Sequence, residues 1–276
     1  LVDDLHEYLF ALLFWDWGEP FLHPHAYKMI RLATDRGIKV MASTNGHLFA
    51  DLREASNVVD SNLDVLVFSI DGTTQETYHQ FRRNGILDTV TAGIKNVVTE
   101  KKRMKKTLPL VNLRFIVNSH NEHEIDSVKQ LASELEVDVL TLRKFHSVSD
   151  FDPNLREAHD FIPTDSLFQI PLREENNRIV KTVRNPCKNL WNCPTVHWDG
   201  TVCSCFMDYN GQRPLGNLLE TSIHDIWFGA DYQELRKRFK KNWWEDPMCN
   251  RCSNGFVGGN IGRDANARAY YLNDKS

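Results

Sequence analysis

The residues best suited to chemistry in this 276-residue sequence are its six cysteines, none of which precedes Cys187. Four of them are separated by seventeen, forty-three and two residues, and this set is Cys187, Cys205, Cys249 and Cys252. A Cys-x2-Cys pair lets two sulfurs face one metal centre, and two distant cysteines complete a four-thiolate site. The spacing predicts a zinc site or an iron–sulfur cluster, and zinc is the simpler interpretation of spacing alone. Cys193 and Cys203 can replace a member of the set or act as small apolar side chains.

Helical and strand patterns alternate over residues 1–150. Apolar runs predict strands at Leu12–Trp17, Ile38–Ser43, Val65–Ile70, Leu110–Asn118 and Val139–Leu142. Apolar residues at helical spacing predict helices over Leu5–Leu12, Ala26–Ala33, Leu52–Asp60, Asp88–Lys101 and Glu122–Leu135. Strands that alternate with helices imply a parallel sheet, either an open doubly wound sheet or a barrel.

Polar segments follow each predicted strand, where both arrangements bind their ligands. These segments are Trp17–Glu19, Ser43–Gly46, Ser69–Gly72, Val117–Asn121 and Arg143–His146. By themselves Thr44-Asn45-Gly46 and Asp71-Gly72 are also ordinary turn sequences, because Asn, Asp and Gly favour turns.

Composition excludes several classes of function. With 33 Lys and Arg against 37 Asp and Glu, the formal net charge is −4, whereas proteins that bind nucleic acid are usually basic. No stretch approaches the roughly 20 apolar residues of a membrane-spanning helix. We therefore expect a cytoplasmic protein with neither a nucleic acid nor a membrane as its partner. Its length suits an α/β domain at 1–150, a linker with the last elements of that domain at 151–186, and a cysteine-rich domain at 187–276.

Together these motifs resemble the radical S-adenosylmethionine superfamily, in the group that carries a C-terminal SPASM or shorter twitch domain. In the first domain the resemblance rests on Trp17-Gly18-Glu19-Pro20, Ser43-Thr44-Asn45-Gly46 and Ser69-Ile70-Asp71-Gly72. In the second it rests on Cys187, Asp199-Gly200-Thr201-Val202, Cys205 with Asp208, Leu215-Gly216-Asn217, Ile223-His224-Asp225-Ile226-Trp227 and Cys249 with Cys252. Each motif is weak alone, but their order and their coverage of nearly the whole chain are specific.

The resemblance implies a partial (β/α)6 barrel that lacks its first strand and binds S-adenosylmethionine at its strand ends. The Gly-Glu-Pro loop of the family meets the methionine amino group, a role that would pass to Gly18 and Glu19, with Pro20 beside them. A carboxylate suits an ammonium there. The ribose and carboxylate of the ligand would face Asn45, Ser69 and Asp71, and Arg114 or the Asn118–Glu122 loop would finish the pocket.

The resemblance also implies one auxiliary [4Fe–4S] cluster, held by Cys187, Cys205, Cys249 and Cys252, because six cysteines cannot supply two complete sets of four. Members of the family hold a second, S-adenosylmethionine-binding cluster in a Cys-x3-Cys-x2-Cys segment ahead of Gly-Glu-Pro. This sequence has no cysteine there. We expect that the biological chain extends N-terminally to supply the first strand and that cluster; the alternative is a degenerate member without radical chemistry.

The family reaction is reductive cleavage of S-adenosylmethionine to a 5′-deoxyadenosyl radical. It implies a radical oxidoreductase, or an enzyme that modifies a small-molecule, sugar or peptide substrate, with a flavodoxin- or ferredoxin-like reductant. Arg143 and His146, after the strand Val139–Leu142, are candidate catalytic residues that face the substrate. Two alternatives stay open: a non-catalytic binding protein with a structural four-cysteine zinc site, and a cluster-bearing electron-transfer partner that does not cleave S-adenosylmethionine.

Overall fold

The computed structural model describes residues 1–145, 160–169, 173–175, 178–180, 187–249 and 267–272. The chain forms two compact units. One, here the sheet unit, comprises Val2–Phe145, Phe161–Gln169 and Ala267–Ser276. The other, here the cysteine unit, comprises His146–Asp160 and Ile170–Asn266 together with Leu1. No helix among the described residues is both long enough and apolar enough to cross a membrane.

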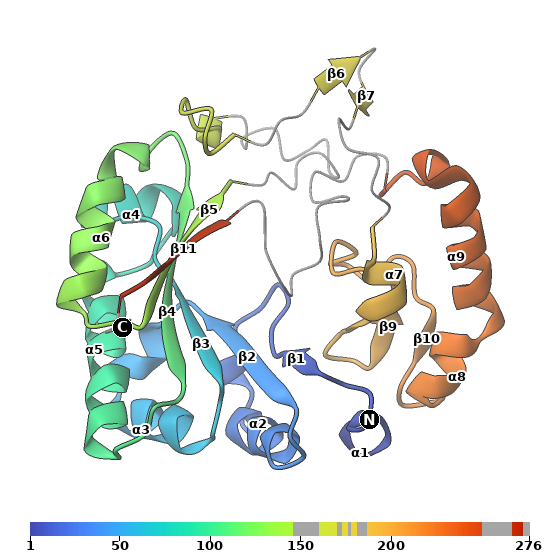
Figure 1. Ribbon diagram of the computed structural model, residues 1–276, viewed down its shortest axis with the longest axis horizontal. Coiled ribbons are helices and arrows are strands. Elements are labelled where there is room, and N and C mark those ends of the chain that lie inside the picture. The colour runs from blue at the N-terminus through green and yellow to red at the C-terminus, as the bar shows by residue number, and fades with distance from the viewer. Residues whose placement is uncertain (146–159, 170–172, 176–177, 181–186, 250–266, 273–276) are drawn as a thin grey trace. The chain divides into compact units, whose positions relative to one another are not determined.

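The sheet unit is built on a six-stranded sheet of order β1-β2-β3-β4-β5-β11 (Figure 1). Its strands are β1 (Ala11–Leu13), β2 (Lys39–Thr44), β3 (Val65–Ser69), β4 (Leu110–Val117), β5 (Val139–Lys144) and β11 (Ala267–Tyr271). Strands β1 to β5 pair in parallel, as predicted, and each lies beside the next in sequence. This order differs from a doubly wound sheet, whose strand order reverses part-way. Strand β11 was not predicted; it pairs antiparallel with β5 and belongs to the sheet unit, although it lies within the range 187–276.

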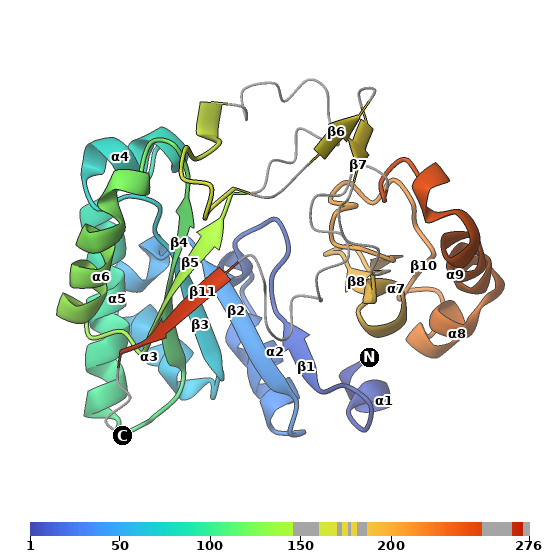
Figure 2. The same cartoon turned by 45° about the horizontal axis from the view of Figure 1, so that its top comes forward.

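Helices cover one face of this sheet (Figures 1 and 2). They are α2 (Ala26–Thr34), α3 (Leu52–Asp60), α4 (Gln75–Phe81), α5 (Leu87–Arg103) and α6 (Ile125–Glu134), with 3-10 turns η1 (Pro20–Leu22), η2 (His47–Ala50) and η3 (Glu122–Glu124). The short helix α1 (Val2–Leu5) lies apart from this layer, beside the N-terminus, and has no buried side chain. The first helix is shorter than predicted, since it ends at Leu5 and leaves Tyr8 81% exposed. Helix α4 was not predicted; its single buried side chain, Tyr78, gives too weak an apolar period.

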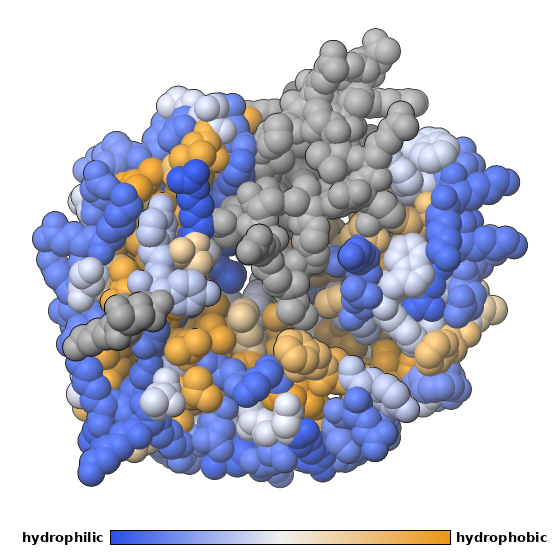
Figure 3. Space-filling model, viewed as in Figure 1, coloured by the Kyte–Doolittle hydropathy of each residue, from blue (hydrophilic) through white to orange (hydrophobic). Residues whose placement is uncertain are grey.

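The core lies between these helices and the sheet. Along β4, Val111, Leu113, Phe115 and Val117 are fully buried and join the core cluster, while the alternate residues are only half-buried. This alternation means that only one face of the sheet is covered by helices. The outward surfaces of α5 and α6 are mostly hydrophilic (Figure 3), as expected for a single covering layer.

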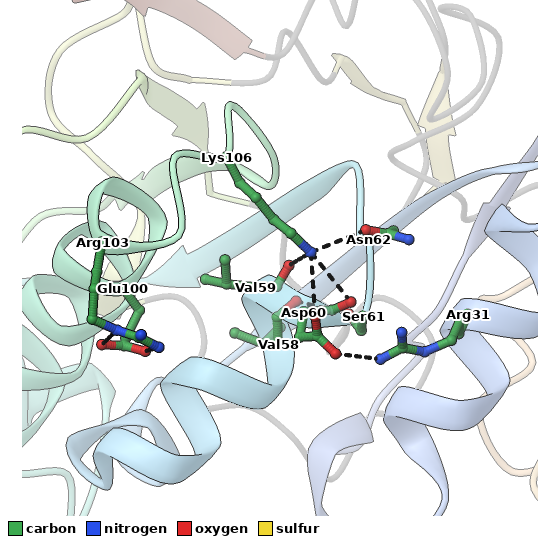
Figure 4. A network of polar contacts seen from close by, with 9 residues as sticks. All are labelled: Arg31, Val58, Val59, Asp60, Ser61, Asn62, Glu100, Arg103 and Lys106. Atoms are coloured by element: carbon green, nitrogen blue, oxygen red, sulfur yellow. Dashed lines mark hydrogen bonds and ion pairs between the residues drawn. The ribbon is translucent and has the colours of Figure 1, made fainter.

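Polar contacts also tie the helices together where α3 ends (Figure 4). The ammonium of Lys106 donates to the carbonyl of Val59 at 3.2 Å and lies 3.4 Å from the Asp60 carboxylate. Arg31 on α2 donates to the same carboxylate at 2.8 Å, and this hydrogen bond is the main reason that the pKa of Asp60 is lowered. Cations at a helix C-terminus complement its dipole, so Lys106 supports the fold.

Acidic residues just before two strands hold the neighbouring strand. Asp138 precedes β5, and its Oδ2 accepts hydrogen bonds from the Val111 N–H of β4 at 2.7 Å and from Lys101 at 2.5 Å. Asp64 precedes β3 and accepts from the Val40 N–H of β2 at 2.8 Å. These carboxylates accept hydrogen bonds from backbone N–H groups at the amino ends of the strands. That edge of a parallel sheet serves stability rather than ligand binding.

We expect Asp138→Ala to lower the free energy of unfolding by about 3 kcal/mol, because it leaves the nearly buried Lys101 ammonium and the Val111 N–H without their acceptor. Urea denaturation measures the loss. The matched control is Asp126→Ala, which removes an almost fully exposed partner of Lys129 and should leave the midpoint unchanged. Equal midpoints for both variants would contradict the role given to Asp138.

The cysteine unit is small and mixed. It contains the hairpin β6 (Arg173–Glu175) and β7 (Arg178–Val180), the antiparallel sheet β8 (Thr195–Val196), β9 (Thr201–Cys203) and β10 (Gly216–Asn217), helices α7 (Asn189–Asn192), α8 (Ile223–Phe228) and α9 (Ala230–Asn242), and the turn η5 (Trp243–Glu245). Arg236 of α9 packs against the rings of Trp227 and Tyr232, 4.2 Å from each centroid, and donates to the carbonyl of Leu190 at 2.8 Å. This buried guanidinium joins α7, α8 and α9.

Candidate functional site

The loop after β1 is joined to the loop after β2 by Glu19. Its Oε2 accepts the Asn45 N–H at 2.7 Å, and its Oε1 accepts the Phe21 N–H at 3.5 Å as it caps η1. Burial raises the pKa of Glu19, although hydrogen bonds from Asn45, the Thr44 hydroxyl and Phe21 oppose that rise. The predicted residue is therefore a half-buried carboxylate at the carboxyl edge of the sheet. Gly18 beside it has open space, since an added Cβ would meet no atom within 4 Å.

The loop after β2 is held by its own side chains. Asn45 Oδ1 accepts the His47 N–H at 3.0 Å and also contacts His47 Nδ1 at 3.1 Å. Because His47 Nε2 accepts the Ile86 N–H at 3.0 Å, the ring proton sits on Nδ1 and points at Asn45. Gly46 has a φ of +86°, and a Cβ there would lie 2.8 Å from Val90. Asn45 is therefore exposed on a turn that requires glycine at position 46.

The loop after β3 is built around a buried carboxylate. Asp71 is fully buried; its Oδ2 accepts the Arg82 Nε–H at 2.6 Å and its Oδ1 accepts the Ile116 N–H of β4 at 2.7 Å. Gly72 is required by packing, because a Cβ there would lie 2.3 Å from the Tyr78 nitrogen at α4. The structure therefore uses Asp71 within the protein, while Ser69 lies half-buried on the opposite face of the sheet from the helices.

Three further residues complete this loop. Asn121 belongs to the strand-end segment Val117–Asn121 that the sequence indicated, whereas Glu124 and Arg82 were missed. Asn121 donates to the Asp71 carbonyl at 3.0 Å, and the buried Glu124 accepts the Thr73 N–H at 2.8 Å. Arg82, at the end of α4, neutralises Asp71. The sequence gives one indication of the role of Arg82: a buried acid after a strand requires a partner. The sequence does not identify which residue that partner is.

Polar side chains gather on the sheet face away from the helices. Ser69, Arg114 and Thr141 are in register on β3, β4 and β5. Asn112, two residues before Arg114, has a buried Oδ1 that accepts no hydrogen bond from the described residues. The Arg114 guanidinium lies 5.9 Å from the ring centroid of Trp15, in the loop after β1. A β4 side chain therefore reaches a loop three strands away.

The predicted catalytic pair is only partly described. Arg143 lies half-buried on the same sheet face as Arg114, in register with Ile116 of β4. Its neighbour Lys144 donates to the Gln169 carbonyl at 2.8 Å, which ties the strand end to residues 161–169. His146 lies outside the described residues.

Three of the four predicted metal ligands are described in the cysteine unit. Cys187, Cys205 and Cys249 are half-buried, and Cys252 lies outside the described residues. The sulfur of Cys205 accepts the Met207 N–H at 3.5 Å. Among the residues that the structure describes, no three His, Cys, Asp or Glu side chains are arranged to hold a single metal ion. Cys203 is fully buried, and burial raises the pKa of Cys193.

The other motif residues of this unit shape its small sheet. Asp199 Oδ1 accepts the Thr201 N–H at 3.0 Å, and Gly200 takes a φ of +84° in the β8–β9 turn. Asn217 donates to the Asp199 carbonyl at 3.2 Å, which ties β10 to that turn. These contacts give the motif a structural role around the cysteines.

Comparisons with known proteins agree with this arrangement. Residues 187–253 match the SPASM family, described as an iron–sulfur cluster-binding domain. The chain is 23% identical to the tungsten-containing aldehyde ferredoxin oxidoreductase cofactor-modifying protein of Pyrococcus furiosus, over 92% of this chain and 77% of that protein. The chain carries a SPASM domain and is similar to radical S-adenosylmethionine proteins.

Solved structures of radical S-adenosylmethionine proteins share the fold. Streptococcus suis SuiB bound to precursor peptide SuiA aligns with a TM-score of 0.59 and 12% identity, over 89% of this chain and 60% of that one. The anSMEcpe protein with bound AdoMet and Kp18Cys peptide aligns with a TM-score of 0.52 and 16% identity, over 92% and 78% of the two chains.

We expect Asp71→Ala to lower the free energy of unfolding by about 3 kcal/mol, because it removes one partner of a buried ion pair and of a buried N–H. Chemical denaturation followed by circular dichroism measures the change. Glu76→Ala, an exposed acid on the adjacent helix α4, serves as the control and should not shift the midpoint. Wild-type stability of Asp71→Ala would mean that the Asp71 carboxylate does not support the fold and is available for another role.

Proposed function

We propose that this chain binds S-adenosylmethionine on a partial (β/α)6 barrel and carries one auxiliary [4Fe–4S] cluster in its SPASM domain. The observation that carries the proposal is the set of contacts at the carboxyl edge of the sheet, where Glu19 bonds to Asn45 and Arg114 reaches Trp15. Adjacent strands are about 4.8 Å apart. An arginine that spans from β4 to the loop after β1 supports a sheet curled around its polar face.

The residues of the Gly-Glu-Pro loop fit the ammonium end of S-adenosylmethionine. The open space beside Gly18 lets a ligand approach the backbone, and Pro20 starts η1 and fixes the loop. A carboxylate has about four acceptor sites, so Glu19 retains capacity for an ammonium after its internal hydrogen bonds. Desolvation, which raises the pKa of Glu19, also strengthens its attraction to a cation.

The remaining predicted residues divide into two roles. Asn45, Ser69 and Arg114 are proposed to meet the ribose and carboxylate of the ligand, because they lie on the strand-end turn or on the polar face of the sheet. Asp71 is proposed to hold the Ser69 loop, since both of its oxygens already accept hydrogen bonds. Arg143 lies further along the polar face and is proposed, with His146, to contact substrate.

The donor set of the cysteine unit fits an iron–sulfur cluster. Three half-buried cysteines lie in the unit whose range includes Cys252, and clusters of this kind take four thiolates. Tyr232 gives a second indication: its hydroxyl is buried without a hydrogen-bond partner among the described residues. Burial chiefly raises the pKa of Tyr232, and the nearby thiols of Cys193, Cys205 and Cys203 raise it further. A sulfur acceptor beside this hydroxyl would satisfy it.

The reaction is proposed at the level of chemistry that the family shares. S-Adenosylmethionine with a reducing cluster supplies a 5′-deoxyadenosyl radical that removes a substrate hydrogen. This chain's residues would bind the ligand at Glu19, orient it against the polar sheet face and shield it from water. Relatives named for cofactor modification or solved with bound peptides support a small-molecule or peptide substrate, with sugars as a further option. A flavodoxin- or ferredoxin-like reductant is part of the proposal on the chemistry alone, because the cleavage consumes an electron.

Cluster content tests the proposal. Anaerobically reconstituted protein should be brown and hold about four iron atoms in the SPASM domain. Serine at position 187, 205, 249 or 252 should remove that iron, whereas Cys203→Ser should retain it. Iron analysis and electron paramagnetic resonance measure the outcome. A colourless protein with one zinc ion would instead support the structural zinc alternative.

Formation of 5′-deoxyadenosine separates an enzyme from an electron carrier. The product of the complete reading frame, reduced with dithionite in the presence of S-adenosylmethionine, is expected to release 5′-deoxyadenosine, measured by liquid chromatography. A protein that holds its cluster but releases none would contradict radical catalysis and support the electron-transfer alternative.

We expect Glu19→Gln to weaken S-adenosylmethionine binding roughly 10- to 100-fold, because a hydrogen bond to a charged group contributes about 1.5–3 kcal/mol. Wild-type affinity should fall as the solution becomes more acidic, and at a higher pH than for an exposed glutamate, because the pKa of Glu19 is raised and the protonated acid no longer attracts an ammonium. Isothermal titration calorimetry at several pH values measures both effects. Asp51→Asn, which retains the cap of α3, is the control; equal affinity for wild type and Glu19→Gln would contradict the assignment.

A further inference from the structure

Two predicted cluster ligands, Cys205 and Cys249, lie on separate loops that hydrogen bonds connect. The Asp208 N–H donates to the Cys205 carbonyl at 3.0 Å. The carboxylate of Asp208 then accepts the N–H groups of Gln212 and Arg213, each at 2.9 Å. The Cys205 loop therefore folds back on itself and ends at Arg213.

The side chain of Arg213 reaches the second loop. Its Nη1 lies 2.9 Å from both oxygens of Asp246. Asp246 Oδ1 also accepts the Met248 N–H at 2.9 Å and the Cys249 N–H at 3.0 Å. One carboxylate thus holds the start of the Cys-x2-Cys turn and the guanidinium of the other loop, so a continuous path of bonds joins Cys205 to Cys249.

This ion pair differs from the surface pairs elsewhere in the unit. The Asp246 side chain is only 19% exposed, and its hydrogen bonds to Arg213, Met248 and Cys249 join it to both cysteine loops. By contrast, Glu234 and Lys237 on α9 lie 4.0 Å apart and are both more than half exposed. A partly buried carboxylate with several charge-assisted bonds restricts a loop far more than an exposed pair does.

We propose that Arg213 and Asp246 are positioning residues that set the spacing of Cys205 and Cys249 for the auxiliary cluster. The inference rests on the proposed function and adds residues to it that bind no iron themselves. Holding two of the four thiolates near their final places reduces the chain entropy that cluster binding must overcome. The Arg213–Asp246 ion pair forms without iron, so it constrains both loops before the cluster is bound.

Iron retention by the anaerobically reconstituted protein tests the proposal. Residues that orient metal ligands typically contribute 10- to 100-fold to affinity, so Asp246→Asn and Arg213→Gln should each release iron to a chelator roughly 10- to 100-fold faster. The g-values of the reduced cluster should shift. The double variant should be no worse than either single variant, because both remove the same pair. Arg213→Lys, which retains the charge, should restore part of the retention.

Glu234→Gln, which breaks the exposed pair of the same unit, is the matched control and should retain iron like wild type. Circular dichroism of the apo-proteins checks folding. If Asp246→Asn does not fold, the g-values and the iron release rate of Arg213→Lys are compared with those of wild type instead. Wild-type rates and g-values in both Asp246→Asn and Arg213→Gln would overturn the positioning role alone. A wild-type protein that binds no iron would contradict the proposed function itself.

Discussion

Carboxylates that accept backbone N–H groups from a neighbouring loop or strand are the interaction on which this structure depends. Loops at strand ends leave backbone donors that must be satisfied when they are buried. Glu19 accepts the Asn45 N–H and joins the loop after β1 to the loop after β2. Asp71 accepts the Ile116 N–H and joins the loop after β3 to strand β4. Asp138 does the same at the opposite edge. Because charge-assisted bonds are short and strong, a few acids give these loops one conformation.

The cysteine unit applies the same constraint to ligands that are far apart in sequence. Asp208 and Asp246 each accept two backbone N–H groups, and Arg213 joins the two loops. A small unit with a limited apolar core gains rigidity from such bonds and from Arg236, which packs against two aromatic rings. Precise placement of metal ligands requires support of this kind from residues that do not touch the metal.

Much of the sheet unit was predictable because its strands are apolar and its longer helices are amphipathic. Strands β2 to β5 and the helices over residues 26–34, 52–60, 87–103 and 125–134 lie where the patterns indicated. Strand β1 (Ala11–Leu13) is shorter than the predicted Leu12–Trp17 and overlaps it at Leu12 and Leu13. Helix α4 was missed because one buried side chain, Tyr78, gives no periodic signal. Strand β11 was missed because antiparallel pairing with β5 depends on a partner more than 120 residues earlier, and pairing leaves no mark in local sequence.

The sequence by itself determined the residue types of the site: a glutamate after β1, polar turns after the next strands and four cysteines in metal-binding spacing. It determined the parallel sheet as well, since hydrophobic periodicity is a local property. Only the tertiary structure decided what each polar group does. It turned Asp71 inward to Arg82, left Ser69 on the polar face, and paired Arg213 with Asp246. Such partners are chosen by the geometry of separate loops in space, which spacing along the chain does not encode.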